Sequence, residues 1–380
     1  MPEQPDRPDR PDRTRLHVGG ASPYDVVVGH AVLDELPAML GPDVRRVAVC
    51  RSDELVDLAD RAVAALAGDV EVLSLPLPDG EAAKTARVAT EAWEKLGVAG
   101  FTRSDAVVTV GGGATTDMGG FIAATWLRGV RLVHVPTTLL AMVDAAVGGK
   151  TGMNTGSGKN LVGSFHEPAG AVCDLDLLST LPAPELASGL GEVVKCGFIA
   201  DPEILALVSR SPAAALEPRS GVLRELVERA IQVKIDVVVG DLKETRGSNG
   251  HPGREVLNYG HTLAHAVEKC TGYRIRHGEA VALGMVFVAE LARLAGRLDD
   301  ETAGRHAKVL TGVGLPTTLE DAGVHEIAFE ELLATMGVDK KARGAQLRFV
   351  VLDGLAEPSI LTDPDESLLR AAYEHVRGAS

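Results

Sequence analysis

Features that commonly reveal a protein's compartment or partners are scarce in this chain. It has four cysteines: Cys50, Cys173, Cys196 and Cys270. They show no paired spacing, so neither a disulfide framework nor a cysteine-based zinc site is indicated. No uninterrupted apolar run reaches the roughly 20 residues that a membrane span needs, and the N-terminus is polar rather than signal-like. We therefore expect a cytoplasmic protein that does not insert into a membrane.

The sequence also lacks a basic patch. Its formal net charge is −15 at pH 7, so most of the surface should repel polyanions, and we do not expect binding to nucleic acid. A small anionic substrate would need lysine and arginine concentrated at its own site. The length of 380 residues, with 45% hydrophobic and 24% charged residues, suffices for a globular chain of two domains.

The first half of the chain has the pattern of an α/β domain. Residues 1–13 hold a Pro-Asp-Arg repeat with no apolar residues to bury, so a disordered tail is expected there. Short β-branched runs then alternate with amphipathic stretches; the runs are YDVVVG, RRVAVC, VEVLSLPLP, DAVVTVGGG and RLVHVPTT. This alternation predicts βαβ units on a largely parallel sheet over residues 14–182.

The second half, residues 183–380, is expected to be mainly helical. Long segments such as SGVLRELVERAIQVKIDVVVGD and GEAVALGMVFVAELARLAG repeat apolar residues at intervals of three and four. One exception is AQLRFVVLDGLAEPSIL, which predicts a β-hairpin that turns through Asp353 and Gly354.

The first chemical signal is VVTVGGGATTDMGGF, Val107 to Phe121, where a buried strand should end in glycines before a helix. Only glycine lets the backbone approach a diphosphate closely, and a helix N-terminus supplies free N–H groups. The stretch predicts a phosphate cradle, but it is not the G-x-G-x-x-G fingerprint, and a turn that serves only strand–helix packing is the alternative. Upstream, Glu81 and Lys84 are candidates to hold a ribose or adenine, although such a stretch alone is more often an ordinary turn.

The second signal is the segment from His134 to Phe165, where four polar residues lie among glycines: Asp144, Lys150, Lys159 and Asn160. Lysines beside such turns are well placed to hold phosphate oxygens. A flexible solvated loop is the alternative, but the flanking segments are too apolar for a free linker.

The third signal is a group of three histidines, His261, His265 and His277, in an apolar and helix-prone stretch. Residues 261 and 265 share a helix face, and such a pair with a carboxylate is a common zinc geometry; Glu192 is a candidate for that carboxylate. Buried histidines are more often hydrogen-bonded core residues, yet three so close together favour a metal. Spacing alone leaves open which two of them are ligands.

Ordered motifs over nearly the whole chain after the tail resemble one known family. They are GGGATTDMGGF, ATWLRGVRLVHVPTTLLAMVDAAVGGKTG, GKNLVGSFHEP, GLGEVVKCGFI, LNYGHTLAHAVE, RHGEAVALGM and DKKARGAQLRFVVL. Together they resemble the 3-dehydroquinate synthases, which are sugar phosphate cyclases. The resemblance implies a Rossmann-like NAD-binding domain followed by a helical metal-binding domain. It also implies a homodimer with one NAD and one zinc ion per subunit, in which Co²⁺ can replace zinc.

The resemblance assigns roles to individual residues of this sequence. Metal ligands are Glu192, His261 and His277, which leaves His265 to face the substrate phosphate. The active-site polar residues are Asp144, Lys195, Asn258 and His265. Phosphate contacts are Lys150, Asn160, Arg128 from the partner subunit, and either Lys340 or Lys341. Lys234 and Arg254 would hold a substrate carboxylate. Cofactor contacts are Gly112, Gly113, Asp117, Thr137, Thr138, Lys159, Thr180 and Glu185, beside the candidates Glu81 and Lys84.

The implied reaction converts 3-deoxy-D-arabino-heptulosonate 7-phosphate into 3-dehydroquinate. Zinc polarises hydroxyls, NAD takes hydride from C5, and phosphate then leaves by β-elimination. Hydride returns to C5, the ring opens and an aldol closure forms the carbocycle, so NAD is regenerated. Three alternatives remain open: another sugar phosphate cyclase (aminodehydroquinate, 2-deoxy-scyllo-inosose or sedoheptulose 7-phosphate type), a metal-dependent polyol dehydrogenase, and a catalytically idle NAD-binding regulator. The many polar residues at motif positions disfavour the last.

Three departures from the family pattern stand out. Ala264 replaces a usual glycine, RGSNGHPG lengthens the connection before Arg254, and the N-terminal tail is extra. None of them removes a motif residue, but the longer connection puts in doubt how Lys234 and Arg254 are brought together.

Overall fold

The computed structural model describes residues 12–66, 68, 70–240, 253–342 and 346–378, without the side chains of residues 338–342. The expected tail lies outside these residues except for Asp12 and Arg13, and Arg13 is the first residue of strand β1 (Arg13–Val18). The chain divides into two compact units, Met1–Leu181 and Pro182–Ser380, called the N-terminal and C-terminal units below.

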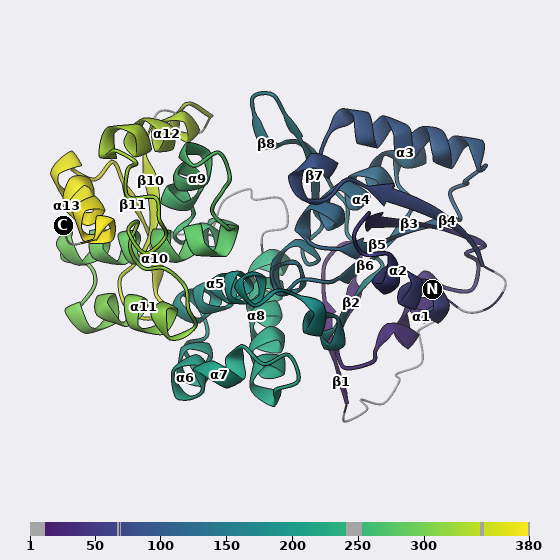
Figure 1. Ribbon diagram of the computed structural model, residues 1–380, viewed down its shortest axis with the longest axis horizontal. Coiled ribbons are helices and arrows are strands. Elements are labelled where there is room, and N and C mark those ends of the chain that lie inside the picture. Colours follow the sequence, from purple (N-terminus) through teal and green to yellow (C-terminus); the bar gives the residue numbers. More distant parts are fainter. Residues whose placement is uncertain (1–11, 67, 69, 241–252, 343–345, 379–380) are drawn as a thin grey trace. The chain divides into compact units, whose positions relative to one another are not determined.

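A seven-stranded sheet forms the centre of the N-terminal unit (Figure 1). After β1, its strands are β2 (Tyr24–Gly29), β3 (Arg46–Ser52), β4 (Glu71–Leu77), β5 (Ala106–Gly111), β6 (Arg131–Pro136) and β9 (Gly170–Asp174). They lie in the order β1-β2-β9-β6-β5-β3-β4. Only the β1–β2 pair is antiparallel, so the predicted largely parallel sheet is confirmed.

Helices cover both faces of this sheet. The α-helices are α1 (Leu36–Leu40), α2 (Val56–Ala65), α3 (Ala86–Val98) and α4 (Gly113–Thr125). Within β5, Val108 and Val110 join the core under α1 and α2, whereas Val107 joins the core under α3 and α4. Side chains of a strand alternate between its two faces, so a strand that is buried on both faces is mostly apolar. Short helical turns complete the unit: η1 (Leu33–Glu35), η2 (Gly80–Ala83), η3 (Trp126–Arg128), η4 (Ala141–Ala145) and η5 (Leu175–Thr180).

A second, two-stranded sheet contains residues that the sequence suggested only as phosphate-holding turns. Its strands are β7 (Lys150–Thr155) and β8 (Gly158–Phe165), which pair antiparallel. β7 packs against α4, and a Cβ on Gly120 of that helix would lie 2.6 Å from Thr151 Cγ2. The hairpin is thereby held close to the N-terminal unit's helix α4.

The C-terminal unit is mainly helical, as predicted. Its helices are α5 (Ala183–Ile199), α6 (Pro202–Arg210), α7 (Pro212–Ala215), α8 (Gly221–Gly240), η6 (Gly253–Asn258), α9 (His261–Cys270), α10 (His277–Leu294), α11 (Asp300–Gly312), α12 (Phe329–Ala342) and α13 (Glu366–Arg377). The predicted hairpin is confirmed as β10 (Arg348–Leu352) and β11 (Pro358–Thr362), with Leu352 paired to Pro358. Helix α10 is buried on nearly all sides, which explains why it is apolar around its whole circumference.

Glycines let α10 approach two neighbours at backbone contact. A Cβ on Gly278 would lie 1.7 Å from the Ser188 carbonyl oxygen of α5, and one on Gly284 would lie 1.9 Å from the Gly260 carbonyl oxygen. Real Cβ atoms do not approach backbone oxygens so closely, so only glycine fits at these two positions. We call these two contacts the glycine crossings of α10.

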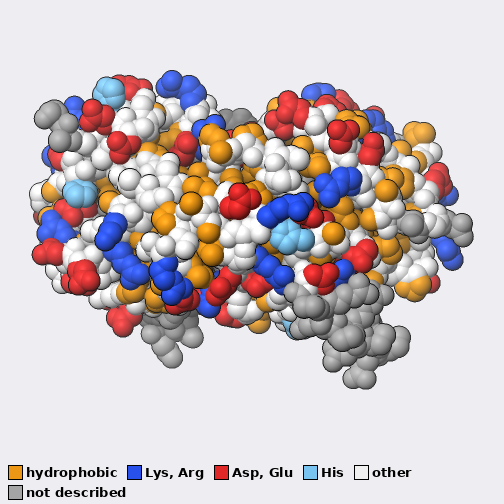
Figure 2. Space-filling model, turned by 60° about the horizontal axis from the view of Figure 1, so that its bottom comes forward, with side chains coloured by type: hydrophobic (Ala, Val, Ile, Leu, Met, Phe, Trp, Pro, Cys, Tyr) orange, Lys and Arg blue, Asp and Glu red, His pale blue; other side chains and the backbone are white. Residues whose placement is uncertain are grey.

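No helix within the described part of the chain combines the length and apolarity needed to cross a membrane. On the face shown in Figure 2, acidic and basic side chains lie interspersed rather than gathered by sign.

Candidate active site

Three side chains of the C-terminal unit converge on one point. Glu192 lies on α5, and His261 and His277 are the first residues of α9 and α10. Glu192 Oε1 is 3.4 Å from Nε2 of each histidine. One potential ligand atom from each residue lies within 4.8 Å of the others, so the three form a candidate metal centre.

Hydrogen bonds around this centre set the orientation of both imidazoles. His261 Nδ1 lies 3.1 Å from the Tyr259 carbonyl oxygen, and His277 Nδ1 lies 3.3 Å from Glu268 Oε2. Because Nδ1 must donate to an oxygen, the neutral form of each ring carries its lone pair on Nε2, which faces Glu192.

The donor set fits a divalent cation. Glu192 Oε2 accepts a hydrogen bond from Lys195, whereas Oε1 is buried and has no hydrogen-bond partner among the described residues. A buried carboxylate oxygen without a partner is costly, and a cation placed against it and two imidazole nitrogens would satisfy it. Two nitrogens and one oxygen are a set that zinc binds readily, with a further position left for a substrate or water.

The electrostatics of the centre also favour a positive charge. Burial opposes ionisation of Glu192, but Lys195 and the two histidines hold its pKa well below the usual range. Burial, helped by Lys195, lowers the pKa of His261 to about 3. Burial also opposes the charged form of His277, but the neighbouring carboxylates of Glu192 and Glu268 outweigh burial and raise the pKa of His277 to about 10. One positive charge, a proton or a metal ion, is thus favoured between these two carboxylates.

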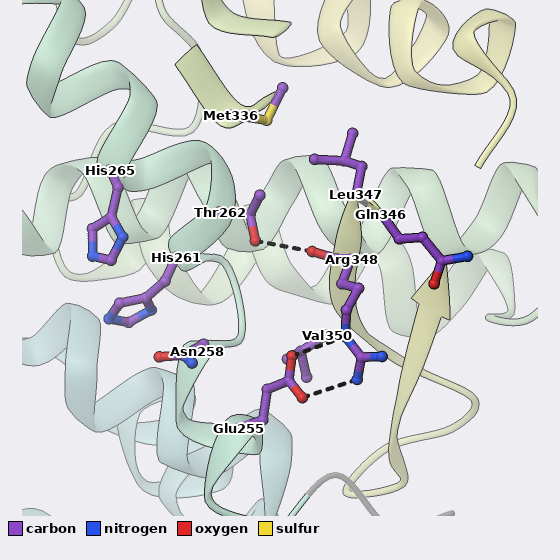
Figure 3. Close-up of a pocket in the computed structure, with 10 residues that line it drawn as sticks. All are labelled: Glu255, Asn258, His261, Thr262, His265, Met336, Gln346, Leu347, Arg348 and Val350. Atoms are coloured by element: carbon purple, nitrogen blue, oxygen red, sulfur yellow. Dashed lines mark hydrogen bonds and ion pairs between the residues drawn. The ribbon is translucent and has the colours of Figure 1, made fainter. Parts of the chain in front are cut away.

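A pocket opens beside this centre (Figure 3). It is lined by Glu255, Asn258, His261, Thr262, His265, Met336, Gln346, Leu347, Arg348 and Val350. The rings of His261 and His265 are 5.4 Å apart edge to face, so the predicted active-site residues Asn258 and His265 share a cavity with one candidate ligand. Lys234 of α8 and Arg254 of η6 are both buried, and these two helices pack against each other.

The glycine stretch of the N-terminal unit forms a turn between β5 and α4. Gly112 is the residue before α4, and a Cβ there would lie 3.2 Å from Thr138 Cγ2. Thr137 N donates to the Gly111 carbonyl oxygen over 3.0 Å, which holds the residues that follow β6 beside the glycine turn. The first N–H groups of a helix have no acceptor within it, so α4 presents donors where the backbone is bare of side chains.

A polar network joins several predicted cofactor residues to the β7–β8 hairpin. Lys84 Nζ donates to Asp117 Oδ2 over 2.5 Å and also to Asn160 Oδ1. Lys159 Nζ lies 3.4 Å from Glu81 Oε1. Burial raises the pKa of Asp117 in spite of Lys84. The structure therefore brings Asn160, expected at the substrate phosphate, into contact with a residue expected at the cofactor.

Several other predicted residues of the N-terminal unit are not part of this polar network. Asp144 is in η4, Lys150 is exposed at the start of β7, and Arg128 is exposed with φ of 68°. Thr137 is buried, and Thr138 Oγ1 accepts from Ala141 N over 3.1 Å.

The remaining predicted residues lie elsewhere or outside the described side chains. Thr180 Oγ1 donates to the Leu177 carbonyl oxygen over 3.0 Å, and Glu185 accepts from Arg276 over 2.7 Å in the C-terminal unit. The side chains of Lys340 and Lys341 are outside the described part, as is the lengthened connection before Gly253. Ala264 lies buried inside α9.

Sequence reasoning assigned no role to Glu268 or to the pair of Glu255 and Arg348. Glu268 is seven residues after His261, so both lie on one face of α9, and this spacing was the available signal. The Glu255–Arg348 pair joins η6 to β10 across 93 residues, so no local spacing in the sequence could predict it.

Comparison with known proteins gives the same family for both units. Profiles of the 3-dehydroquinate synthase N-terminal and C-terminal domains match residues 74–188 and 189–342. The chain is 55% identical to the 3-dehydroquinate synthase of Thermobifida fusca (strain YX), over 97% of each chain. It is 54% identical to that of Streptomyces avermitilis, over 96% of this chain and 98% of the relative.

Solved structures with this fold include other cyclases. A 2-epi-5-epi-valiolone synthase from Streptomyces hygroscopicus subsp. jinggangensis 5008, with NAD⁺ and Zn²⁺ bound, superposes with a TM-score of 0.83 at 26% identity. That match covers 96% of this chain and 99% of the other. A 2-deoxy-scyllo-inosose synthase with carbaglucose-6-phosphate, NAD⁺ and Co²⁺ gives 0.84 at 24% identity, over 95% of this chain and 99% of the other, which supports the fold alone.

Proposed function

Because the chain belongs to the 3-dehydroquinate synthase family, we propose that it converts 3-deoxy-D-arabino-heptulosonate 7-phosphate into 3-dehydroquinate and phosphate, in the cytoplasm. The observation that carries the proposal is the cluster of Glu192, His261 and His277, whose buried Glu192 oxygen lacks a hydrogen-bond partner among the described residues. The cluster opens on a pocket that also contains Asn258 and His265.

The two cofactors of the proposal are zinc and NAD. Zinc would be held by Glu192, His261 and His277, and the NAD diphosphate would lie over Gly112 and Gly113. In support, the related valiolone synthase contains both NAD⁺ and Zn²⁺. When bound, the metal polarises substrate hydroxyls, and the nicotinamide accepts a hydride and later returns it.

The chain's own residues would bind, orient and exchange protons. Lys195 donates to Glu192 and so holds that carboxylate in its ionised form. His265 and Asn258 reach the pocket as donors for the substrate phosphate and hydroxyls. Further candidates for proton exchange and phosphate binding are Asp144, Lys150, Asn160 and one lysine of the Lys340–Lys341 pair.

Substrate choice would depend on Lys234 and Arg254, the pair expected to hold the substrate carboxylate. Both side chains are buried, so a sugar phosphate without that carboxylate would forgo charge-assisted hydrogen bonds to two desolvated cations. Losing such a contact costs roughly 2–4 kcal/mol. This favours the heptulosonate over sedoheptulose 7-phosphate or glucose 6-phosphate.

A homodimer is also part of the proposal. Strand β8 exposes apolar side chains to solvent. Leu161 is 62% accessible and Phe165 is 49% accessible. Leu127, beside Arg128, is 40% accessible. Exposed apolar groups of this kind are typical of protein interfaces, and a second copy of the chain would cover them while receiving Arg128.

The decisive experiment follows phosphate release from the heptulosonate 7-phosphate with and without NAD. We expect release only with NAD and zinc, and no net growth of NADH absorbance over many turnovers. Stoichiometric NADH would instead support a polyol dehydrogenase. Comparable turnover of sedoheptulose 7-phosphate, or unchanged kinetics in Arg254→Ala, would show that the substrate is wrong.

A further inference from the structure

Arg348, at the start of β10, holds a carboxylate at the edge of the candidate substrate pocket (Figure 3). Its Nη2 donates to Glu255 Oε2 over 3.0 Å, and its Nε donates to Glu255 Oε1 over 3.3 Å. Its carbonyl oxygen accepts from Thr262 Oγ1 over 3.3 Å. The two-pronged grip fixes both oxygens of Glu255 in one direction.

The position of Glu255 places its negative charge where it can affect binding of an anionic substrate. It immediately follows Arg254, lies three residues before Asn258, and lines the same pocket as His265. The side chain of Glu255 is 26% accessible and that of Arg348 is 39%, so solvent screens their charges only partly. Without the Arg348 guanidinium, the Glu255 carboxylate would repel an anionic substrate more strongly and compete with it for nearby cations.

We propose that Arg348 is a positioning residue that pairs with Glu255 and fixes the direction of its carboxylate, so that the pocket accepts an anion. The inference rests on the proposed function, because it requires a negatively charged sugar phosphate in this pocket. It assigns no chemical step to Arg348. The tie through Thr262 keeps the start of β10 beside α9, where the guanidinium reaches Glu255.

A mutant cycle separates this role from a purely structural tie. Arg348→Met removes the cation paired with Glu255, whereas Glu255→Gln with Arg348→Met removes both charges of this ion pair. We expect Arg348→Met to raise KM for the sugar phosphate roughly 3- to 10-fold at low salt, with a smaller change in kcat. The double variant should recover most of that loss, and added salt should reduce the defect of the single variant.

Arg293→Met is a matched control. Arg293 grips both oxygens of Glu290 on α10 over 2.7 and 2.8 Å, and its side chain is 36% accessible, close to that of Arg348. Glu290 and Arg293 do not line the pocket, so this variant should leave KM unchanged.

The outcomes distinguish the inference from the proposed function. If the unmodified protein releases no phosphate from the heptulosonate, the proposed function fails and the inference falls with it. If the unmodified protein is active but Arg348→Met keeps its KM, or the double variant is as impaired as the single one, only the inference is overturned. An equal rise of KM in Arg293→Met would also overturn it.

Discussion

In the N-terminal unit the candidate cofactor cradle is made of backbone, whereas in the C-terminal unit the candidate metal centre is made of side chains. The cradle uses consecutive residues, Gly111 to Gly113, between one strand and the next helix. The metal centre uses Glu192, His261 and His277 from three helices. A site made of backbone requires residues without side chains that would block the ligand. A site made of side chains requires the helices that carry them to cross at a short distance.

The largest expected effect follows from removing one side chain of the metal centre. His261→Ala should lower zinc affinity by more than about 100-fold, beyond the effect of losing a residue that only supports a ligand. Phosphate release should fall with the zinc content. His325→Ala, which changes an exposed histidine, is the control and should keep full zinc. If elemental analysis finds one zinc ion per subunit in both His261→Ala and His277→Ala, these two histidines are not the metal ligands.

Glycine substitution should affect the two regions in different ways. Gly278→Ala places a Cβ 1.7 Å from the Ser188 carbonyl oxygen, so α5 and α10 must separate. We expect a loss of about 3 kcal/mol in the free energy of unfolding, at the upper end of overpacking effects, together with weaker zinc binding.

Gly113→Ala is the counterpart in the cradle. Its Cβ would lie 3.7 Å from Ala145 Cβ, which is an ordinary contact, so the melting temperature should hardly change. NAD binding should weaken about 10-fold, because the added methyl group meets the diphosphate. A fall in melting temperature as large as that of Gly278→Ala, with unchanged NAD affinity, would contradict a backbone-built cradle.

A smaller effect should come from the support of a metal ligand. Glu268→Gln keeps an acceptor for His277 Nδ1 but removes the negative charge beside the ring. Zinc affinity, measured by competition with a chelator, should fall about 10-fold, the lower end of the range for such supporting residues. Unchanged affinity would mean that Glu268 only fills space in the core.

The smallest effect comes from two buried histidines, His134 in the N-terminal unit and His306 in the C-terminal unit. Burial lowers the pKa of His134 in β6 to about 3 and that of His306 in α11 to about 4. Their folded pKa values lie below the unfolded value of 6.5, so the unfolded chain binds protons first as pH falls, and stability declines below that pH.

From pH 7 to pH 6 each of these histidines should cost about 0.7 kcal/mol of unfolding free energy. Denaturant titrations at both pH values measure the change. The variant His134→Asn should show a correspondingly smaller decline. A decline of the same size in this variant would mean that other groups control the pH dependence.

The sequence was sufficient to predict most of the sheet but not the β7–β8 hairpin. The runs around Val108 and Val133 are mostly apolar because helices cover both faces of their strands. Lys150–Thr155 and Gly158–Phe165 contain lysine, asparagine and glycine and show no strict alternation, so their pairing depends on packing against α4. The hairpin of β10 and β11 was readable because its turn carries Asp353 and Gly354.

The candidate site was predictable to different depths. The cradle is contiguous, so its glycines could be interpreted from the residues alone. For the histidines, spacing suggested His261 with His265, yet the Nε2 atoms nearest Glu192 belong to His261 and His277. Their approach depends on the crossing of α5 and α10, which no local pattern contains, and only the family resemblance selected them.

The glycine crossings of α10 also bear on engineering such a centre elsewhere. Copying Glu192, His261 and His277 onto another helical scaffold would reproduce the ligands but not the short distance between the helices that carry them. Helix axes usually lie 8–10 Å apart, and side chains at the contact set that spacing. A designer would have to transfer Gly278 and Gly284 with the ligands, since these two residues set the distance between the backbones that carry the ligands.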